Sequence, residues 1–175
     1  KKAIERGADV TLISGPTSLD IPTGVNFIKV NTNEEMLNAV LDNFNDSNIV
    51  VKSAAVADFN VKEYSKEKIK KTDSNLVIEL EIDKDILETL GKQKTNQIIV
   101  GFAAESSNVI ENAKAKLKRK NIDYIVANDI TSNDTGFASD DNKVTIISSL
   151  GDVISLDKMS KREVAKNIFD MIKGR

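Results

Sequence analysis

The side chains of this chain that could do chemistry are lysines, arginines, carboxylates and hydroxyls, because the sequence contains neither histidine nor cysteine. The lack of histidine removes the commonest general base and metal ligand, and the lack of cysteine removes disulfides, thiolate nucleophiles and thiolate metal sites. Catalysis by the remaining groups would depend on the placement of the reactants and on the stabilisation of charge in the transition state. The composition therefore favours phosphoryl or nucleotidyl transfer over proton abstraction.

One candidate site is the segment 52–58, KSAAVAD, which directly follows a short apolar run. Its small residues would let a ligand approach backbone amides closely, and Asp58 could orient a hydroxyl, an amine or a metal. The alternative is tight strand packing beside a solvated carboxylate, and such runs are common. The residues alone leave both interpretations open.

A second candidate is the lysine-rich segment 66–71, KEKIKK. Ammonium groups clustered on an exposed segment could close over a polyphosphate, because each lysine is a compact point charge. The alternative is a solvated charged loop.

Two further candidates follow later strand patterns. The segment 101–105, GFAAE, leads into a basic helix in which Lys116 and Lys120 stand four residues apart and share one face. These two cations could hold an anion between them, or they could complement the negative end of their helix. The segment 127–130, ANDI, ends another strand with two side chains able to read polar groups.

The apolar pattern predicts the elements that must position these groups. Helices are expected after Thr32 and after Ser160, each of which has a glutamate three residues on, as in a capping box. The charged stretch 59–75 is interpreted as an exposed flap, and alternation over 76–82 predicts a half-buried strand. The other expected elements are strands at 10–14, 25–30, 49–51, 98–102 and 124–127, a hairpin of 144–147 with 153–154, and helices at 85–90 and 107–120.

Strands that alternate with helices predict an α/β fold with a doubly wound, mostly parallel sheet and right-handed crossovers. Ligands of such sheets lie at the carboxyl ends of the strands. The segment 1–8 reads as the end of a helix closed at Gly7, so we expect a single domain over 1–175 that lacks a preceding strand, loop and half-helix.

Composition also limits the partners. The 25 basic and 27 acidic residues give a net charge of −2, which offers no reason to expect nucleic acid or an anionic membrane as a partner. No apolar run approaches the ~20 residues that a membrane-spanning helix needs, so a cytoplasmic protein is expected. The sequence contains no G-x-G-x-x-G, Walker or G-x-S-x-G motif. If the protein were a dehydrogenase, its glycine-rich dinucleotide-binding motif would have to lie upstream of Lys1.

Five motifs occur in order along the chain: 14–19 (SGPTSL), 54–59 (AAVADF), 68–71 (KIKK), 101–105 (GFAAE) and 127–130 (ANDI). Together they closely resemble phosphopantothenoylcysteine synthetase, the carboxy-terminal half of the bifunctional bacterial coenzyme A biosynthesis protein. Each motif is weak by itself, whereas five in order at this spacing are specific. The resemblance covers nearly the whole chain.

The resemblance implies a Rossmann-like fold with a flap and a two-step ligation. The carboxylate of 4′-phosphopantothenate attacks the α-phosphate of CTP, pyrophosphate leaves, and the amine of cysteine then displaces CMP from the acyl-cytidylate. Members of the family use Mg²⁺ and work as homodimers, and the flavin-dependent decarboxylase half of the full-length protein is an implied partner domain.

The resemblance also assigns residues. It implies Lys68 as the catalytic lysine of a K-x-K-K flap motif, and Ala54, Ala55 and Asp58 as contacts of the pantothenate substrate. The family often has proline where this chain has Lys84. The residues implied to bind the nucleotide are Lys52, Ser53, Ala54, Asp58, Lys68, Lys84, Asp85, Ile86, Leu87, Phe102, Lys116 and Lys120.

The family also has a Gly- and Ser-rich first loop, with an asparagine that acts on the intermediate, and this loop would lie upstream of Lys1. Without it the chain could hold much of the nucleotide surface and still be a poor catalyst. The alternative function is therefore a non-catalytic nucleotide-binding module, and a Rossmann oxidoreductase is a third possibility.

Overall fold

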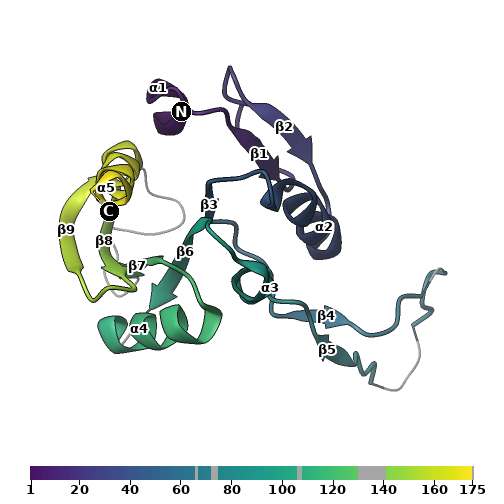
Figure 1. Cartoon of the computed structure of the whole chain (residues 1–175). Coiled ribbons are helices and arrows are strands. Elements are labelled where there is room, and N and C mark those ends of the chain that lie inside the picture. The colour runs from purple at the N-terminus through teal and green to yellow at the C-terminus, as the bar shows by residue number, and fades with distance from the viewer. Residues whose placement is uncertain (66, 72–74, 106–107, 130–140, 175) are drawn as a thin grey trace.

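The computed structural model describes residues 1–65, 67–71, 75–105, 108–129 and 141–174. Helices and strands alternate along most of this length (Figure 1). The elements are α1 (Lys2–Glu5), β1 (Thr11–Ser14), β2 (Asn26–Lys29), α2 (Asn33–Phe44), β3 (Ile49–Lys52), β4 (Phe59–Val61), β5 (Leu80–Ile82), α3 (Ile86–Gln93), β6 (Ile98–Glu105), α4 (Val109–Lys120), β7 (Tyr124–Asp129), β8 (Asp141–Ser148), β9 (Val153–Ser160) and α5 (Lys161–Lys173). The α/β class expected from the sequence is confirmed.

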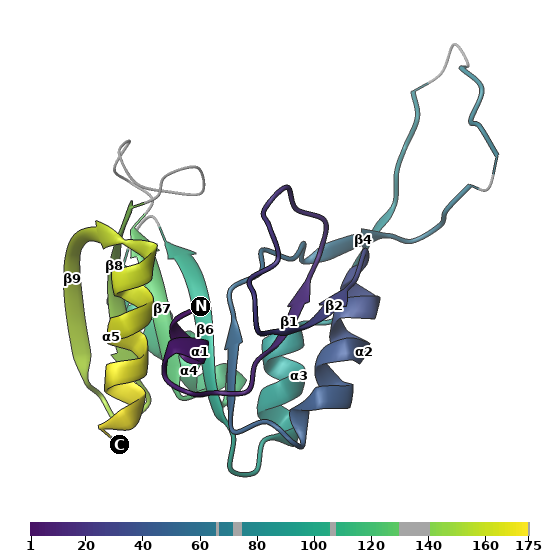
Figure 2. The ribbon, with the colours of Figure 1, turned by 90° about the horizontal axis from the view of Figure 1, so that it is seen from above.

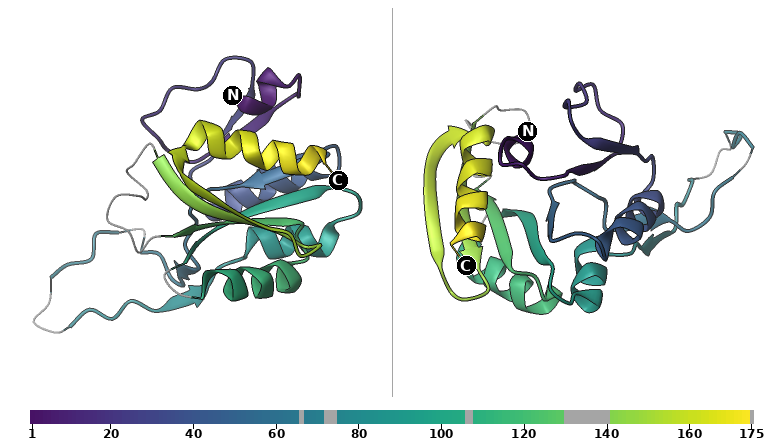
Figure 3. Two further views of the ribbon diagram at one scale, coloured as in Figure 1. Left: turned by 90° about the vertical axis from the view of Figure 1, so that its left-hand side faces the viewer. Right: turned by 45° about the horizontal axis from the view of Figure 1, so that its top comes forward.

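The central sheet has the strand order β3-β6-β7-β8-β9. Strands β3, β6 and β7 are parallel, and the hairpin β8–β9 continues the sheet in antiparallel fashion. Neighbouring residues of one strand enter opposite cores, as Ile99 packs with helices α3 and α4 while Val100 packs with α5. Helices therefore cover both faces of the sheet (Figure 3).

Strands β1 and β2 form a separate parallel pair beside α2. Among the described strands β1 pairs only with β2, and the outer edge of β3 likewise has no strand partner. Both edges line a cavity of about 320 Å³, together with Val40 and Phe44 of α2 and Leu90 of α3. The parallel strands are thus divided between two sheets rather than joined in one.

The arm, here the described residues 59–65, 67–71 and 75–82, projects away from the body between β4 and β5 (Figure 2). Strands β4 and β5 pair in antiparallel fashion at its base. Apart from the half-buried Val61, its described apolar side chains are exposed on both alternating faces, with Val77 86% and Ile82 82% accessible. The expectation of a half-buried strand over 76–82 is therefore wrong: only Leu80–Ile82 is strand, and no described element of the chain covers either face.

Local capping signals in the sequence are confirmed. The hydroxyl of Thr32 accepts from the backbone N–H of Glu35 at 3.1 Å, and Ser160 and Glu163 form a complete capping box at the start of α5. Gly7 has φ of +81°, which closes α1 as expected.

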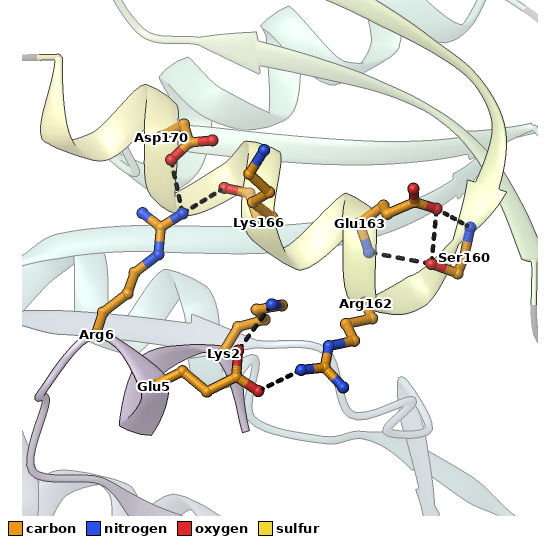
Figure 4. A network of polar contacts seen from close by, with 8 residues as sticks. All are labelled: Lys2, Glu5, Arg6, Ser160, Arg162, Glu163, Lys166 and Asp170. Carbon is orange, nitrogen blue, oxygen red and sulfur yellow. Dashed lines mark hydrogen bonds and ion pairs between the residues drawn. The ribbon is translucent and has the colours of Figure 1, made fainter.

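Helix α1 is fixed against α5 by ion pairs (Figure 4). Arg6 donates to Asp170 at 2.6 Å and lies over the ring of Phe169, and Arg162 donates to Glu5 at 2.7 Å. The beginning of the chain thereby lies beside its last helix. In the described part of the chain, none of the helices has the length and apolar character to span a bilayer.

Candidate functional site

A cleft of about 680 Å³ lies at the carboxyl ends of the parallel strands. Lys52 ends β3, Phe102 lies in β6, and Asn128 lies near the end of β7, and all three line the cleft. Parallel strands bring their carboxyl ends to one edge of a sheet, which is the usual position for a ligand in this class of fold.

The structure brings most of the residues selected from the sequence into this one cleft. They come from β3 and the loop after it, from β6, and from helices α3 and α4. The selected residues that line the cleft are Lys52, Ser53, Ala54, Ala55, Asp58, Leu87, Phe102, Lys116 and Lys120. Segments up to 68 residues apart in the sequence therefore share a single cavity.

An ion pair fixes one cation of the cleft. The ammonium of Lys120 donates to Asp85 at 2.6 Å, and the Lys120 side chain is only 14% exposed. Asp85 also caps α3 by accepting from the backbone N–H of Glu88 at 3.1 Å. Burial raises the pKa of Asp85, but the hydrogen bonds from Lys120 and Glu88 and the nearby lysine charges outweigh it, so its pKa lies below the ordinary value.

Close packing of α3 on α4 positions Lys120. A Cβ added to Gly91 of α3 would lie 1.8 Å from the backbone oxygen of Lys120, and the side chain of Asn121 donates to the backbone oxygen of Gly91 at 2.8 Å. Only glycine allows the two helices to approach this closely.

Lys52 is a second, partly buried cation of the cleft. Burial lowers its pKa, and the positive charge of Lys120 lowers it further, while Asp85 and Asp58 oppose the shift. Two ammonium groups are thus held near one another in a partly desolvated cavity. Such an arrangement favours an anionic ligand, because an anion would relieve the repulsion between them.

Four of the selected residues do not line the cleft. Lys68 is exposed in the arm, outside the cleft wall. Ile86 is 2% exposed and belongs to the core. Asp85 contacts the cleft residue Lys120 through their ion pair. Lys84 lines a different cavity of about 800 Å³, and its backbone oxygen accepts from Asn33 at 3.1 Å.

Sequence reasoning missed several groups on the opposite wall of the cleft. Asn142 of β8 and Lys161 of α5 line it together with Asn128, which had been noted only as part of the segment 127–130. Among the described residues, the buried Oδ1 atoms of Asn128 and Asn142 find no hydrogen-bond partner. Asn142 and Lys161 belong to elements that follow the recognisable motifs, and they reach the cleft because β8 pairs with β7 and α5 packs on the same sheet.

A Mg²⁺ ion would need oxygen ligands at the cleft. The described residues contain no group of three or more acidic side chains that could hold a metal ion. Mg²⁺ commonly binds through one or two carboxylates together with substrate phosphates and water. Asp58 on the cleft wall fits that arrangement, with most of the remaining ligands coming from the substrate.

Comparison with known proteins assigns this chain to a family. Residues 1–174 match the model of the DNA/pantothenate metabolism flavoprotein C-terminal domain. The chain belongs to this family. The match includes every element that lines the cleft.

Two curated relatives are bifunctional coenzyme A biosynthesis proteins, CoaBC. The Bacillus subtilis protein is 46% identical over 171 residues, which is 97% of this chain and 42% of the relative. The Borreliella burgdorferi protein is 43% identical over 175 residues, which is 98% of this chain and 44% of the relative. The chain thus spans less than half the length of these relatives.

A solved structure supports the same assignment. The crystal structure of the C-terminal domain of a coenzyme A biosynthesis bifunctional protein CoaBC matches with a TM-score of 0.82 and 39% sequence identity. The match covers 98% of this chain and 78% of the solved one. The family resemblance and the α/β fold expected from the sequence are therefore confirmed.

Proposed function

We propose that this chain is the phosphopantothenate–cysteine ligase domain of a coenzyme A biosynthesis protein and that it uses CTP. The observation that carries the proposal is the convergence of Lys52, Lys116 and Lys120 with Asp58 in one cleft at the carboxyl ends of the strands. Cations so placed suit a polyphosphate. Family membership supplies the reaction class.

In the first step a carboxylate oxygen of 4′-phosphopantothenate bonds to the α-phosphorus of CTP, and the bond from that phosphorus to the β-phosphate bridging oxygen breaks. Pyrophosphate leaves with the electron pair, and an acyl-cytidylate remains. Negative charge grows on the departing pyrophosphate, so Lys116 and Lys120 would bind it and Lys52 would orient the α-phosphate. Mg²⁺ bound to the phosphates would neutralise part of the same charge.

In the second step the neutral amine of cysteine attacks the acyl carbon. CMP leaves with the electrons of the carbon–oxygen bond, the attacking nitrogen passes a proton to the departing phosphate of CMP, and an amide forms. The small side chains of Ala54 and Ala55 leave their backbone groups accessible for the pantothenate carboxylate, and Asp58 would orient the substrate.

Lys68 would act from the arm. Its K-x-K-K motif is exposed in the structure, so the arm must change position for Lys68 to reach the phosphates. Closure of the arm would also exclude water from the acyl-cytidylate, which hydrolysis would otherwise destroy.

We also propose that the chain forms a homodimer through the arm. The arm exposes Leu76, Val77, Ile78, Leu80 and Ile82, and the edge of a two-stranded sheet readily pairs with another strand. We expect sedimentation to give a dimer for the unaltered chain and a monomer for an Ile82→Ser, Val77→Ser variant. Equal masses for both would contradict an arm interface.

In the full-length protein we expect a flavin-dependent decarboxylase domain as the covalent partner, by analogy with the bifunctional relatives. The alternative function is a nucleotide-binding module without turnover. It is favoured by one observation, namely that Lys68 does not line the cleft.

The deciding experiment measures pyrophosphate release from CTP. We expect release that requires 4′-phosphopantothenate, and formation of the cysteine amide when cysteine is added. Binding of CTP with no pyrophosphate release under either condition would support the nucleotide-binding module instead. Tight binding of NADH would favour an oxidoreductase.

A further inference from the structure

The wall of the cleft opposite α4 is formed by the first two turns of α5. Lys161, Val164, Ala165 and Ile168 line it at positions i, i+3, i+4 and i+7, so they form one face of the helix. Val164 and Ile168 of this face are buried in the core. Lys161 is thus the charged residue of this face and lies at the N-terminal end of the helix.

The other charged residues of this turn have partners elsewhere. Arg162 donates to Glu5 at 2.7 Å, and Glu163 accepts from the hydroxyl and the backbone N–H of Ser160 in the capping box (Figure 4). No ion pair joins Lys161 to another residue of the described ranges. A cation in the first helical turn is also disfavoured by the helix dipole, so the helix itself does not explain its place.

The charges of the cleft are unbalanced. Among the described residues that line it, the charged side chains are Lys52, Lys116, Lys120 and Lys161 against Asp58, and Lys120 also pairs with Asp85, which does not line the cleft. Lys52 lies at the end of β3 and Lys116 and Lys120 lie on α4, whereas Lys161 faces them from α5. An elongated anion that lies across the carboxyl ends of the strands would therefore meet ammonium groups from both faces of the sheet.

We propose that Lys161 is a further polyphosphate-binding residue, which holds the outer phosphates of the nucleotide from the side opposite Lys116 and Lys120. The inference rests on the proposed function, because that function identifies the nucleotide as CTP. The expectation that the ligand is an anion rests instead on the lysines of the cleft. In the reaction the same contact would help to stabilise the departing pyrophosphate. A purely structural role, in which the lysine stem covers apolar surface at the end of the helix, would leave ligand affinity unchanged.

The test compares Lys161→Gln with Lys161→Arg and with Lys166→Gln, an exposed lysine of the same helix that does not line the cleft. Because an ammonium–phosphate hydrogen bond is charge-assisted, we expect Lys161→Gln to weaken CTP binding roughly 10-fold to 100-fold in calorimetry. CMP binding should change little, since CMP lacks the outer phosphates. Lys161→Arg should retain most of the affinity, and Lys166→Gln should match the unaltered chain.

Binding of CTP, CMP and inorganic tripolyphosphate, measured beside pyrophosphate release, separates this inference from the proposed function. CTP affinity that is equal in the unaltered chain and in Lys161→Gln would overturn the role of Lys161 and leave the ligase proposal intact. Equal weakening of CTP and CMP would overturn the assignment to the outer phosphates. A third outcome combines two results: inorganic tripolyphosphate binds the unaltered chain but not Lys161→Gln, and the unaltered chain releases no pyrophosphate from CTP. That outcome would support phosphate binding by Lys161 and overturn the ligase proposal.

Discussion

The cleft and the arm of this protein are built in opposite ways. The cleft is lined by residues of the packed body, and its cation Lys120 is held by an ion pair to Asp85. The arm lies outside the body and exposes apolar side chains such as Val77 and Ile82 on both faces. The cleft is therefore formed within one chain, whereas the arm needs a further surface to cover it.

This difference divides the proposed chemistry. Binding of the nucleotide would depend on groups already in place, and the catalytic step would depend on Lys68, which the arm carries. Substitutions in the two regions should accordingly change different quantities, with affinity changing for the cleft and turnover for the arm.

The largest effect is expected from Lys68→Gln. Loss of one charge-stabilising donor typically lowers turnover roughly 10²–10³-fold, so kcat should fall by about that factor while the calorimetric affinity for CTP changes little. Lys62→Gln is the matched control, because Lys62 lies on the same arm and pairs with Glu79 at 2.7 Å. A comparable loss of affinity and turnover in Lys68→Gln would break the division between the two regions.

A smaller effect, on binding, is expected from Lys116→Ala combined with Lys120→Ala. CTP binding should weaken roughly 10-fold to 100-fold and CMP binding much less, because these lysines are proposed to meet the outer phosphates. The double variant Lys114→Ala, Lys118→Ala alters exposed lysines of the same helix that do not line the cleft. If this control weakened CTP binding equally, general charge rather than the cleft would be responsible.

Gly91→Ala should reduce stability. Alanine ordinarily favours a helix interior over glycine, but here its Cβ would meet the backbone oxygen of Lys120 at 1.8 Å. Overpacking of this kind typically costs about 1–3 kcal/mol, and thermal unfolding should begin several degrees lower. Gly15→Ala should unfold as the unaltered chain does, because beyond the adjacent residues no described part of the chain lies within 4 Å of the added Cβ. A gain in stability for Gly91→Ala would show that α3 and α4 are less closely packed.

The smallest effect is expected from Asp85→Asn, which keeps a helix-capping side chain and removes the ion pair to Lys120. Because the pKa of Asp85 is lowered in the folded chain, its contribution is present above the ordinary aspartate pKa and is lost as pH falls through the folded value. Urea unfolding should therefore show a deficit of about 0.5–1 kcal/mol near neutral pH that shrinks as pH falls below the ordinary aspartate pKa of about 3.9. A deficit that is constant with pH would point to the cap instead of the ion pair.

The features that sequence predicted best depend on near neighbours. Thr32 with Glu35 and Ser160 with Glu163 are separated by three residues, so the caps follow from local geometry alone. The pairing of Lys116 with Lys120 on one face likewise needs only the helical repeat. Parallel pairing brings the carboxyl ends of neighbouring strands to one edge of the sheet, which explains why Lys52 and Phe102 line the same cleft.

Features that depend on remote contacts do not follow from the local sequence pattern. The alternation over 76–82 predicts a buried face, but burial requires a covering surface that a periodic pattern does not specify. Lys84 stands next to Asp85 and nevertheless faces another cavity, because the chain turns into α3 between them. Lys161 enters the cleft only because the β8–β9 hairpin returns the chain to the same edge of the sheet.

The contacts between α1 and α5 have a consequence for folding. Arg162 and Glu5 are 157 residues apart in the sequence, and Arg6 and Asp170 are 164 apart. Contacts of such separation close the longest loops and form late, and these ion pairs are exposed and individually weak. The first turn of the chain should accordingly dock last and open first, with backbone amides of residues 5–8 exchanging with solvent far faster than those of β6 and β7.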